Sequence, residues 1–163
     1  MQTELSFGEI DLSHLETSTE LAEIKVIYKS ENKNKVKITN SKDVFNILNS
    51  LYDKDTIGFQ EQFYMLLLNK GNVLLGWIKL STGGISGTVV DLKIIFATAL
   101  KAFASGIVVS HNHPSTNVNP SNEDVSITKK INDAGKLFEI KLLDHIIVAP
   151  DNTYFSFADE GIL

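Results

Sequence analysis

The sequence predicts an α/β protein in which helices flank a mixed β-sheet. Several segments are dense in aliphatic and aromatic residues, which is typical of buried strands. These expected strands lie at residues 61–68, 73–80, 107–113 and 138–148. Two further segments space their apolar residues as amphipathic helices do. One, at residues 91–103, is expected to begin at a capping Asp91, and the other, at residues 121–135, is expected to end at Gly135, a residue type that commonly stops a helix. The resulting order of strand, strand, helix, strand, helix, strand favours a single mixed sheet.

Composition limits the kinds of protein that this chain can be. Its 163 residues are enough for one domain with a core of its own, and its 43% hydrophobic and 21% charged residues are typical of a soluble globular protein. With no cysteine, any metal must be held by nitrogen and oxygen. A net charge of −5 does not favour nucleic-acid binding. No signal peptide or membrane span is visible, so we expect a cytoplasmic protein.

The first third of the chain, residues 1–55, is expected to form an extension, and residues 56–163 are expected to form the main domain. The extension contains an acidic leader at residues 1–23, then two alternating strands that predict a hairpin, and then a helix. The hairpin strands are expected at residues 24–28 and 35–38. The helix is expected to begin at a capping serine, Ser41, and to end near Tyr52.

The segment with the strongest functional signal is the end of the expected strand that begins with the apolar residues 107–109. Alternate residues of a strand share one face, so His111 and His113 direct their rings toward the same point, while Asn112 faces the other way. Pro114 then ends the strand. Two imidazoles placed in this way supply half of a metal site.

Asp124 is the natural third ligand of such a site. A catalytic zinc typically has three protein ligands from nitrogen and oxygen and keeps its fourth position for water. Ser121 and Asp124 also have the spacing of a helix cap, with a serine at the N-cap and an acid three residues later. Capping alone explains these two residues, but it gives no reason for two histidines just upstream. We therefore interpret the pattern as a zinc site.

The pattern His-x-His-Pro followed by Pro-Ser-x-x-Asp resembles the JAMM motif of MPN-type metallopeptidases. More narrowly, four segments resemble the bacterial RadC family, over about residues 60–148: His-Asn-His-Pro-Ser, Pro-Ser-Asn-Glu-Asp, Ile-Thr-Lys-Lys and Leu-Leu-Asp-His-Ile-Ile-Val. The resemblance is to a short form without the helix-hairpin-helix region. It implies an MPN (JAB)-like fold, a cytidine-deaminase-like sandwich, with Zn²⁺ as cofactor.

The resemblance also implies roles for individual residues. Glu61 matches the catalytic glutamate of JAMM proteins, although a glutamate at the head of a strand can simply face water. As the base, Glu61 would take a proton from a zinc-activated water and return it to the leaving amine. Ser121 would stabilise the oxyanion. The implied reaction is hydrolysis of an amide or isopeptide bond in a peptide or protein substrate.

Two alternatives stay open at this point. Asp144 and His145 interrupt an apolar strand, and they are either a hydrogen-bonded core pair or side chains that orient a ligand histidine. The chain as a whole can also be a zinc protein without turnover, or one associated with nucleic acid and DNA repair, as the RadC name implies. The sequence gives neither the substrate nor the oligomeric state.

Overall fold

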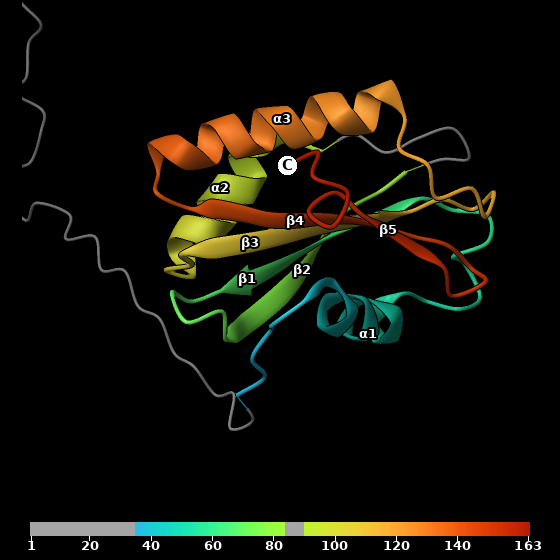
Figure 1. Cartoon of the computed structure of the whole chain (residues 1–163), viewed down its shortest axis with the longest axis horizontal. Coiled ribbons are helices and arrows are strands. Elements are labelled where there is room, and N and C mark those ends of the chain that lie inside the picture. The colour runs from blue at the N-terminus through green and yellow to red at the C-terminus, as the bar shows by residue number, and fades with distance from the viewer. Residues whose placement is uncertain (1–34, 84–89) are drawn as a thin grey trace, which may run out of the picture.

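The computed structural model of the chain describes residues 35–83 and 90–163, which form a five-stranded sheet and three helices (Figure 1). The strands are β1 (Gln62–Leu68), β2 (Leu74–Thr82), β3 (Gly106–Asn112), β4 (Lys141–Val148) and β5 (Tyr154–Ser156). The helices are α1 (Ser41–Leu51), α2 (Leu92–Lys101) and α3 (Asn122–Leu137). The predicted α/β class is confirmed.

The sheet is mixed, with the strand order β2-β1-β3-β4-β5. Strand β1 is antiparallel to both β2 and β3, β3 and β4 run parallel, and β5 is an antiparallel edge strand. Helices α2 and α3 cover one face of the sheet and α1 covers the other (Figure 1). None of the helices in the described ranges combines the length and the hydrophobicity that a bilayer-spanning segment needs.

The core has two layers because the central strands bury both of their faces. All seven residues of β1 and of β3 are buried, and alternate side chains enter opposite layers. Leu66 packs in the layer under α1, whereas Met65 packs in the layer under α2 and α3. The predicted extension helix thus contributes Leu48 to the core of the sheet. The domain boundary placed at residue 55 stays a prediction.

The helix caps agree with the sequence patterns at two starts out of three. Asp91 caps α2 by accepting a hydrogen bond from the Lys93 amide at 2.8 Å, and Ser121 caps α3, as predicted. The predicted cap of α1 is wrong by one residue. Asn40, not Ser41, is its N-cap, because the Asn40 side chain accepts from the amide of Asp43 at 2.9 Å.

The predicted hairpin is only partly covered by the structure. The acidic leader and the strand at residues 24–28 lie outside the described residues. The second expected strand, at residues 35–38, is not a strand: Lys37 forms one isolated bridge with Val73. The amide of Ile38 donates to the carbonyl of Asn72 at 2.9 Å, so this stretch attaches to the turn before β2.

The end of α3 also differs from the prediction, which used Gly135 as a helix stop. The helix continues to Leu137, and the left-handed φ of 55° falls on Glu139. A Cβ at Gly135 would lie 2.3 Å from the carbonyl oxygen of Ile140. Glycine is therefore needed here for a close approach of two backbones. The following strand begins at Lys141, later than predicted.

Candidate metal centre

The two histidines meet as the strand pattern predicts. His111 lies in β3, between β1 and β4, and its side chain is 1% exposed. His113 follows the end of β3, where its amide donates to the carbonyl of Val148 at 2.9 Å. The two Nε2 atoms are 2.9 Å apart. Two ligand-type nitrogens thus face one point at the end of the sheet.

The first turn of α3 brings Asp124 to this point. The amide and hydroxyl of Ser121 donate to Asp124 Oδ2 at 2.8 and 2.6 Å, and the amide of Asp124 donates back to the Ser121 hydroxyl at 3.1 Å. Asp124 Oδ1 lies 3.0 Å from His111 Nε2, and Oδ2 lies 3.5 Å from His113 Nε2. The capping box and the contact with both histidines therefore occur together. The cap is the device that places the carboxylate.

Glu61 approaches the same point from a third element. It immediately precedes β1, its side chain is 15% exposed, and its Oε1 lies 3.9 Å from His111 Nε2. Glu61, His111 and His113 each offer a ligand atom, and these three atoms lie within 4.8 Å of one another. Asp124 also reaches both histidines, with Oδ1 3.0 Å from His111 Nε2 and Oδ2 3.5 Å from His113 Nε2. Two carboxylates and two imidazoles therefore converge.

The two carboxylates have opposite electrostatic environments. Burial alone would raise the pKa of Asp124, but hydrogen bonds with His111, His113 and Ser121 outweigh it and hold that pKa well below its ordinary range. Burial raises the pKa of Glu61, and the nearby histidines only partly oppose this effect. Asp124 is therefore a fixed anion, whereas Glu61 can exchange a proton more readily.

Asn112 fixes the segment that carries Glu61, a role that its position in the sequence did not reveal. Its side chain is fully buried and donates to the carbonyls of Ile57 and Gln60 at 2.8 and 2.9 Å. Its Oδ1 accepts from the amide of Gln62 at 2.8 Å. These three bonds enclose Glu61 between Gln60 and Gln62. The only signal in the sequence was the position of this asparagine between the two histidines.

The structure separates the two residues that were left open in β4. His145 is fully buried, and its Nε2 lies 2.9 Å from His111 Nδ1. Asp144 points to the other face of the sheet, since neighbours on a strand alternate, and it accepts from the Ser156 hydroxyl and the Ala158 amide at 2.6 and 3.0 Å. His145 thus contacts a candidate ligand. Asp144 instead holds the C-terminal segment.

A groove of about 830 Å³ opens in front of the centre. Its apolar wall comes from Phe59, Pro114 and Pro120, and the Phe59 side chain is 58% exposed. The other lining residues are polar or lack a side chain: Gly58, Glu61, His113, Ser115, Asn117, Asn119 and Ser121. A second cavity of about 240 Å³ reaches His111 and Asp124, and Glu61 borders both spaces. A substrate lying in the groove would contact Glu61 directly.

Comparison with known protein families identifies this arrangement. The sequence matches the model of the RadC-like JAB domain over residues 38–162. The chain belongs to the RadC-like JAB domain family. The predicted family is confirmed, and the mixed sheet with three helices agrees with a JAB/MPN-like domain.

Relatives of this RadC-like JAB domain occur in several bacteria. A UPF0758 protein of Flavobacterium johnsoniae is 44% identical over 77% of this chain and 53% of its own length. UPF0758 proteins of Porphyromonas gingivalis and Staphylococcus haemolyticus are 42% and 37% identical over 64% and 83% of the chain, and over 46% and 58% of their own lengths. The chain spans about half the length of these curated relatives.

Proposed function

We propose that this RadC-like JAB domain is a zinc-dependent hydrolase that cleaves an amide or isopeptide bond. The observation that carries the proposal is the spacing of ligand atoms at the end of β3. Atoms bound to one tetrahedral zinc at about 2.0–2.1 Å lie roughly 3.3 Å from one another. The two histidine Nε2 atoms are 2.9 Å apart, and Asp124 brings Oδ1 to 3.0 Å from His111 and Oδ2 to 3.5 Å from His113, which is close to this spacing.

The opposite environments of the carboxylates support different roles for them. Asp124 is closer to the histidines, is anchored by Ser121 and stays ionised, as a metal ligand must. Glu61 is farther away, and burial raises its pKa, which is the direction of shift that favours a general base. When their surroundings shift the pKa values of two neighbouring carboxylates in opposite directions, one commonly stays ionised and the other exchanges a proton. We therefore assign His111, His113 and Asp124 as ligands.

In this mechanism, a bound zinc would lower the pKa of a water molecule and polarise the substrate carbonyl. Glu61, at the border of the groove, accepts the proton of the water and returns it to the leaving amine nitrogen. Ser121 also lines the groove and is the proposed oxyanion donor. Its hydroxyl can turn from Asp124 toward a substrate, because its backbone amide keeps a hydrogen bond to the same Asp124 oxygen.

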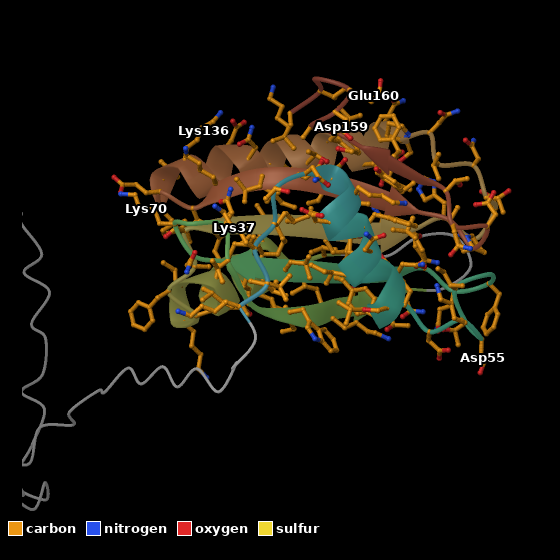
Figure 2. All side chains as sticks on the ribbon, turned by 60° about the horizontal axis from the view of Figure 1, so that its bottom comes forward. Lys37, Asp55, Lys70, Lys136, Asp159 and Glu160 are labelled. Atoms are coloured by element: carbon orange, nitrogen blue, oxygen red, sulfur yellow. The ribbon has the colours of Figure 1, made fainter. Side chains whose placement is uncertain are left out.

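The chemistry of the groove supports a peptide or protein substrate. Its lining includes no lysine, and the whole chain has 15 lysines and no arginine. Proteins normally bind phosphate groups through lysine and arginine side chains, and arginine is favoured because it can donate two parallel hydrogen bonds. Lys70 and Lys136 lie at one end of the molecule, whereas Asp55, in the loop that leads to Phe59, lies at the other (Figure 2). The asparagine, proline and phenylalanine side chains that line the groove are suited to an uncharged stretch of a peptide substrate.

The test combines metal analysis with unbiased cleavage profiling. We expect about one zinc per chain in protein purified without chelator, and less in a His111→Ala, His113→Ala double variant. A peptide library followed by mass spectrometry should show cleavage by the parent, no cleavage after chelation, and recovery when zinc is returned. A parent that keeps zinc yet cleaves no peptide or isopeptide would contradict the hydrolase. Binding or cleavage of DNA instead would favour the nucleic-acid alternative.

A further inference from the structure

Behind His111, away from the groove, three buried side chains form a continuous row of hydrogen bonds. His111 Nδ1 lies 2.9 Å from His145 Nε2, and His145 Nδ1 lies 2.6 Å from the hydroxyl of Thr128. The hydroxyl of Thr128 donates to the backbone carbonyl of Asp124 at 2.5 Å. His111, His145 and Thr128 are 1%, 0% and 4% exposed. The row joins two proposed ligands, from β3 and α3, through residues outside the proposed ligand set.

The direction of every hydrogen bond in this row follows from one proton. A carbonyl oxygen can only accept, so the single hydroxyl proton of Thr128 must point to Asp124, one helical turn earlier. The Thr128 oxygen can then only accept from His145. His145 consequently has its proton on Nδ1 and presents a bare Nε2.

The same reasoning continues to His111. The ring of His145 is fully buried and contacts no carboxylate among the described residues, so it is neutral and has no second proton. Its bare Nε2 can only accept, and His111 must donate from Nδ1. The ring of His145 is also fixed in orientation, because it stacks on Phe157 with ring centroids 4.8 Å apart and packs against Phe63. Nδ1 of His111 is therefore the nitrogen that carries a proton towards His145, and Nε2 is the atom that a metal can bind.

His113 reaches the same state by a shorter route. Its Nδ1 lies 2.7 Å from the backbone carbonyl of Asn117, which can only accept, so Nδ1 carries a proton and Nε2 is the nitrogen that faces the site. The two Nε2 atoms face each other at 2.9 Å beside the Asp124 carboxylate. In the metal-free protein a proton fills this gap, and a metal ion bound here would take its place. Both rings therefore direct the same ring atom, Nε2, toward the candidate metal position.

We infer that Thr128 and His145 are positioning residues that fix His111 in the tautomer offering Nε2 to a metal and that tie this ligand to the start of α3. Hydrogen bonds of this kind orient metal-binding histidines, and their loss typically costs about 10–100-fold in metal affinity. The inference rests on the proposed metal site, but not on hydrolysis. Thr128 and His145 touch neither the groove nor Glu61 among the described contacts, so their effect on a substrate must pass through His111.

The test compares Thr128→Val with Thr128→Ser. Valine keeps the shape of threonine and removes the hydroxyl, whereas serine keeps the hydroxyl. Zinc affinity is measured by competition with a chromophoric chelator, and the proton positions of the rings by ¹⁵N NMR on the metal-free protein. We expect Thr128→Val to lose about 10–100-fold in zinc affinity. Thr128→Ser should bind zinc as the parent does, and the parent should show His111 protonated on Nδ1.

A merely structural role would appear as equal zinc affinity in both variants, whatever their thermal stability, and that result would overturn the inference. A parent whose His111 lacks a proton on Nδ1 would overturn it as well. The readouts also separate this inference from the proposed function. If zinc binds as expected but no peptide is cleaved, only the hydrolase fails. If zinc does not bind the parent at all, the metal site fails, and the NMR tautomer still decides the direction of the hydrogen bonds.

Discussion

The first turn of α3 and the segment before β1 each present a carboxylate to the same two histidines, but they hold it in different ways. The side chain of Asp124 is itself bound, by the amide and hydroxyl of Ser121. Around Glu61 it is the backbone that is bound, through Asn112, and the side chain approaches His111 no closer than 3.9 Å. The hydrogen-bonded carboxylate of Asp124 keeps its negative charge at a fixed position. The carboxylate of Glu61, whose backbone alone is fixed, remains free to accept and release a proton.

The strongest test of this difference is Asp124→Asn, because it removes the anchored charge with little change in size. We expect zinc content to fall to the level of the His111→Ala, His113→Ala double variant and hydrolysis to disappear. Elemental analysis of the purified variant measures the first effect. Since asparagine can still accept from Ser121, α3 should keep its cap and the fold should persist. Zinc at the parental level would mean that Glu61 is the third ligand.

The complementary change is Glu61→Gln, which removes the proposed base. Zinc content and thermal stability should change little, because Glu61 is not one of the three proposed ligands. Peptide hydrolysis should fall by about 10²–10⁴, the usual contribution of general acid-base catalysis. Metal analysis and turnover are measured on the same preparation. Loss of zinc would reverse the roles of the two carboxylates, and unchanged turnover would exclude Glu61 as the base.

Ser121→Ala removes the hydroxyl group that donates a hydrogen bond to the Asp124 carboxylate. Loss of the hydroxyl removes the proposed oxyanion donor, so turnover should fall by about 10²–10³. It also removes one cap interaction, which should lower the free energy of unfolding by about 1 kcal/mol. Ser121→Thr is the matched control, since threonine keeps a capping hydroxyl. A variant that loses stability but keeps full turnover would show that Ser121 serves only the helix.

Asn112→Ala addresses the other anchor and should have the smallest effect on chemistry. Freed from Asn112, the segment of Glu61 can shift relative to the histidines, and a misplacement of about 1 Å can cost up to about 10²-fold in turnover. Zinc affinity should not change. The free energy of unfolding should fall by about 1–3 kcal/mol, since Gln62 loses a buried partner. Chemical denaturation measures the free energy of unfolding, and chelator competition measures the zinc affinity. A changed zinc affinity would contradict the proposal that Asn112 positions Glu61 and not the metal ligands.

The sequence was informative where the determining contacts are local. The spacing of His111 and His113 is a property of one strand, and that of Ser121 and Asp124 is a property of one helical turn. Both arrangements could therefore be predicted. The bonds of Asn112 to residues 57–62 span about fifty positions, and no local pattern encodes them.

Long-range packing also explains the errors at the ends of elements. Gly135 has the residue type of a helix stop, but the carbonyl of Ile140 folds back against it, and the helix continues. The contact of Thr128 could not be predicted from the pattern of the helix, because its partner, His145, lies on a strand 17 residues later. The contacts of Gly135 with Ile140 and of Thr128 with His145 both form only when α3 packs against the sheet.

The capping box of α3 has a kinetic consequence. The amide of Asp124 donates to Ser121 while the carboxylate of the same residue faces the histidines, so opening the first turn of α3 would break the cap and withdraw the proposed ligand in one event. The dissociation of an ion bound by the proposed ligands would then be coupled to fraying of the helix end. The hydrogen-exchange rate of that single amide should then follow the dissociation rate of the metal. One backbone proton would report how long the ion stays.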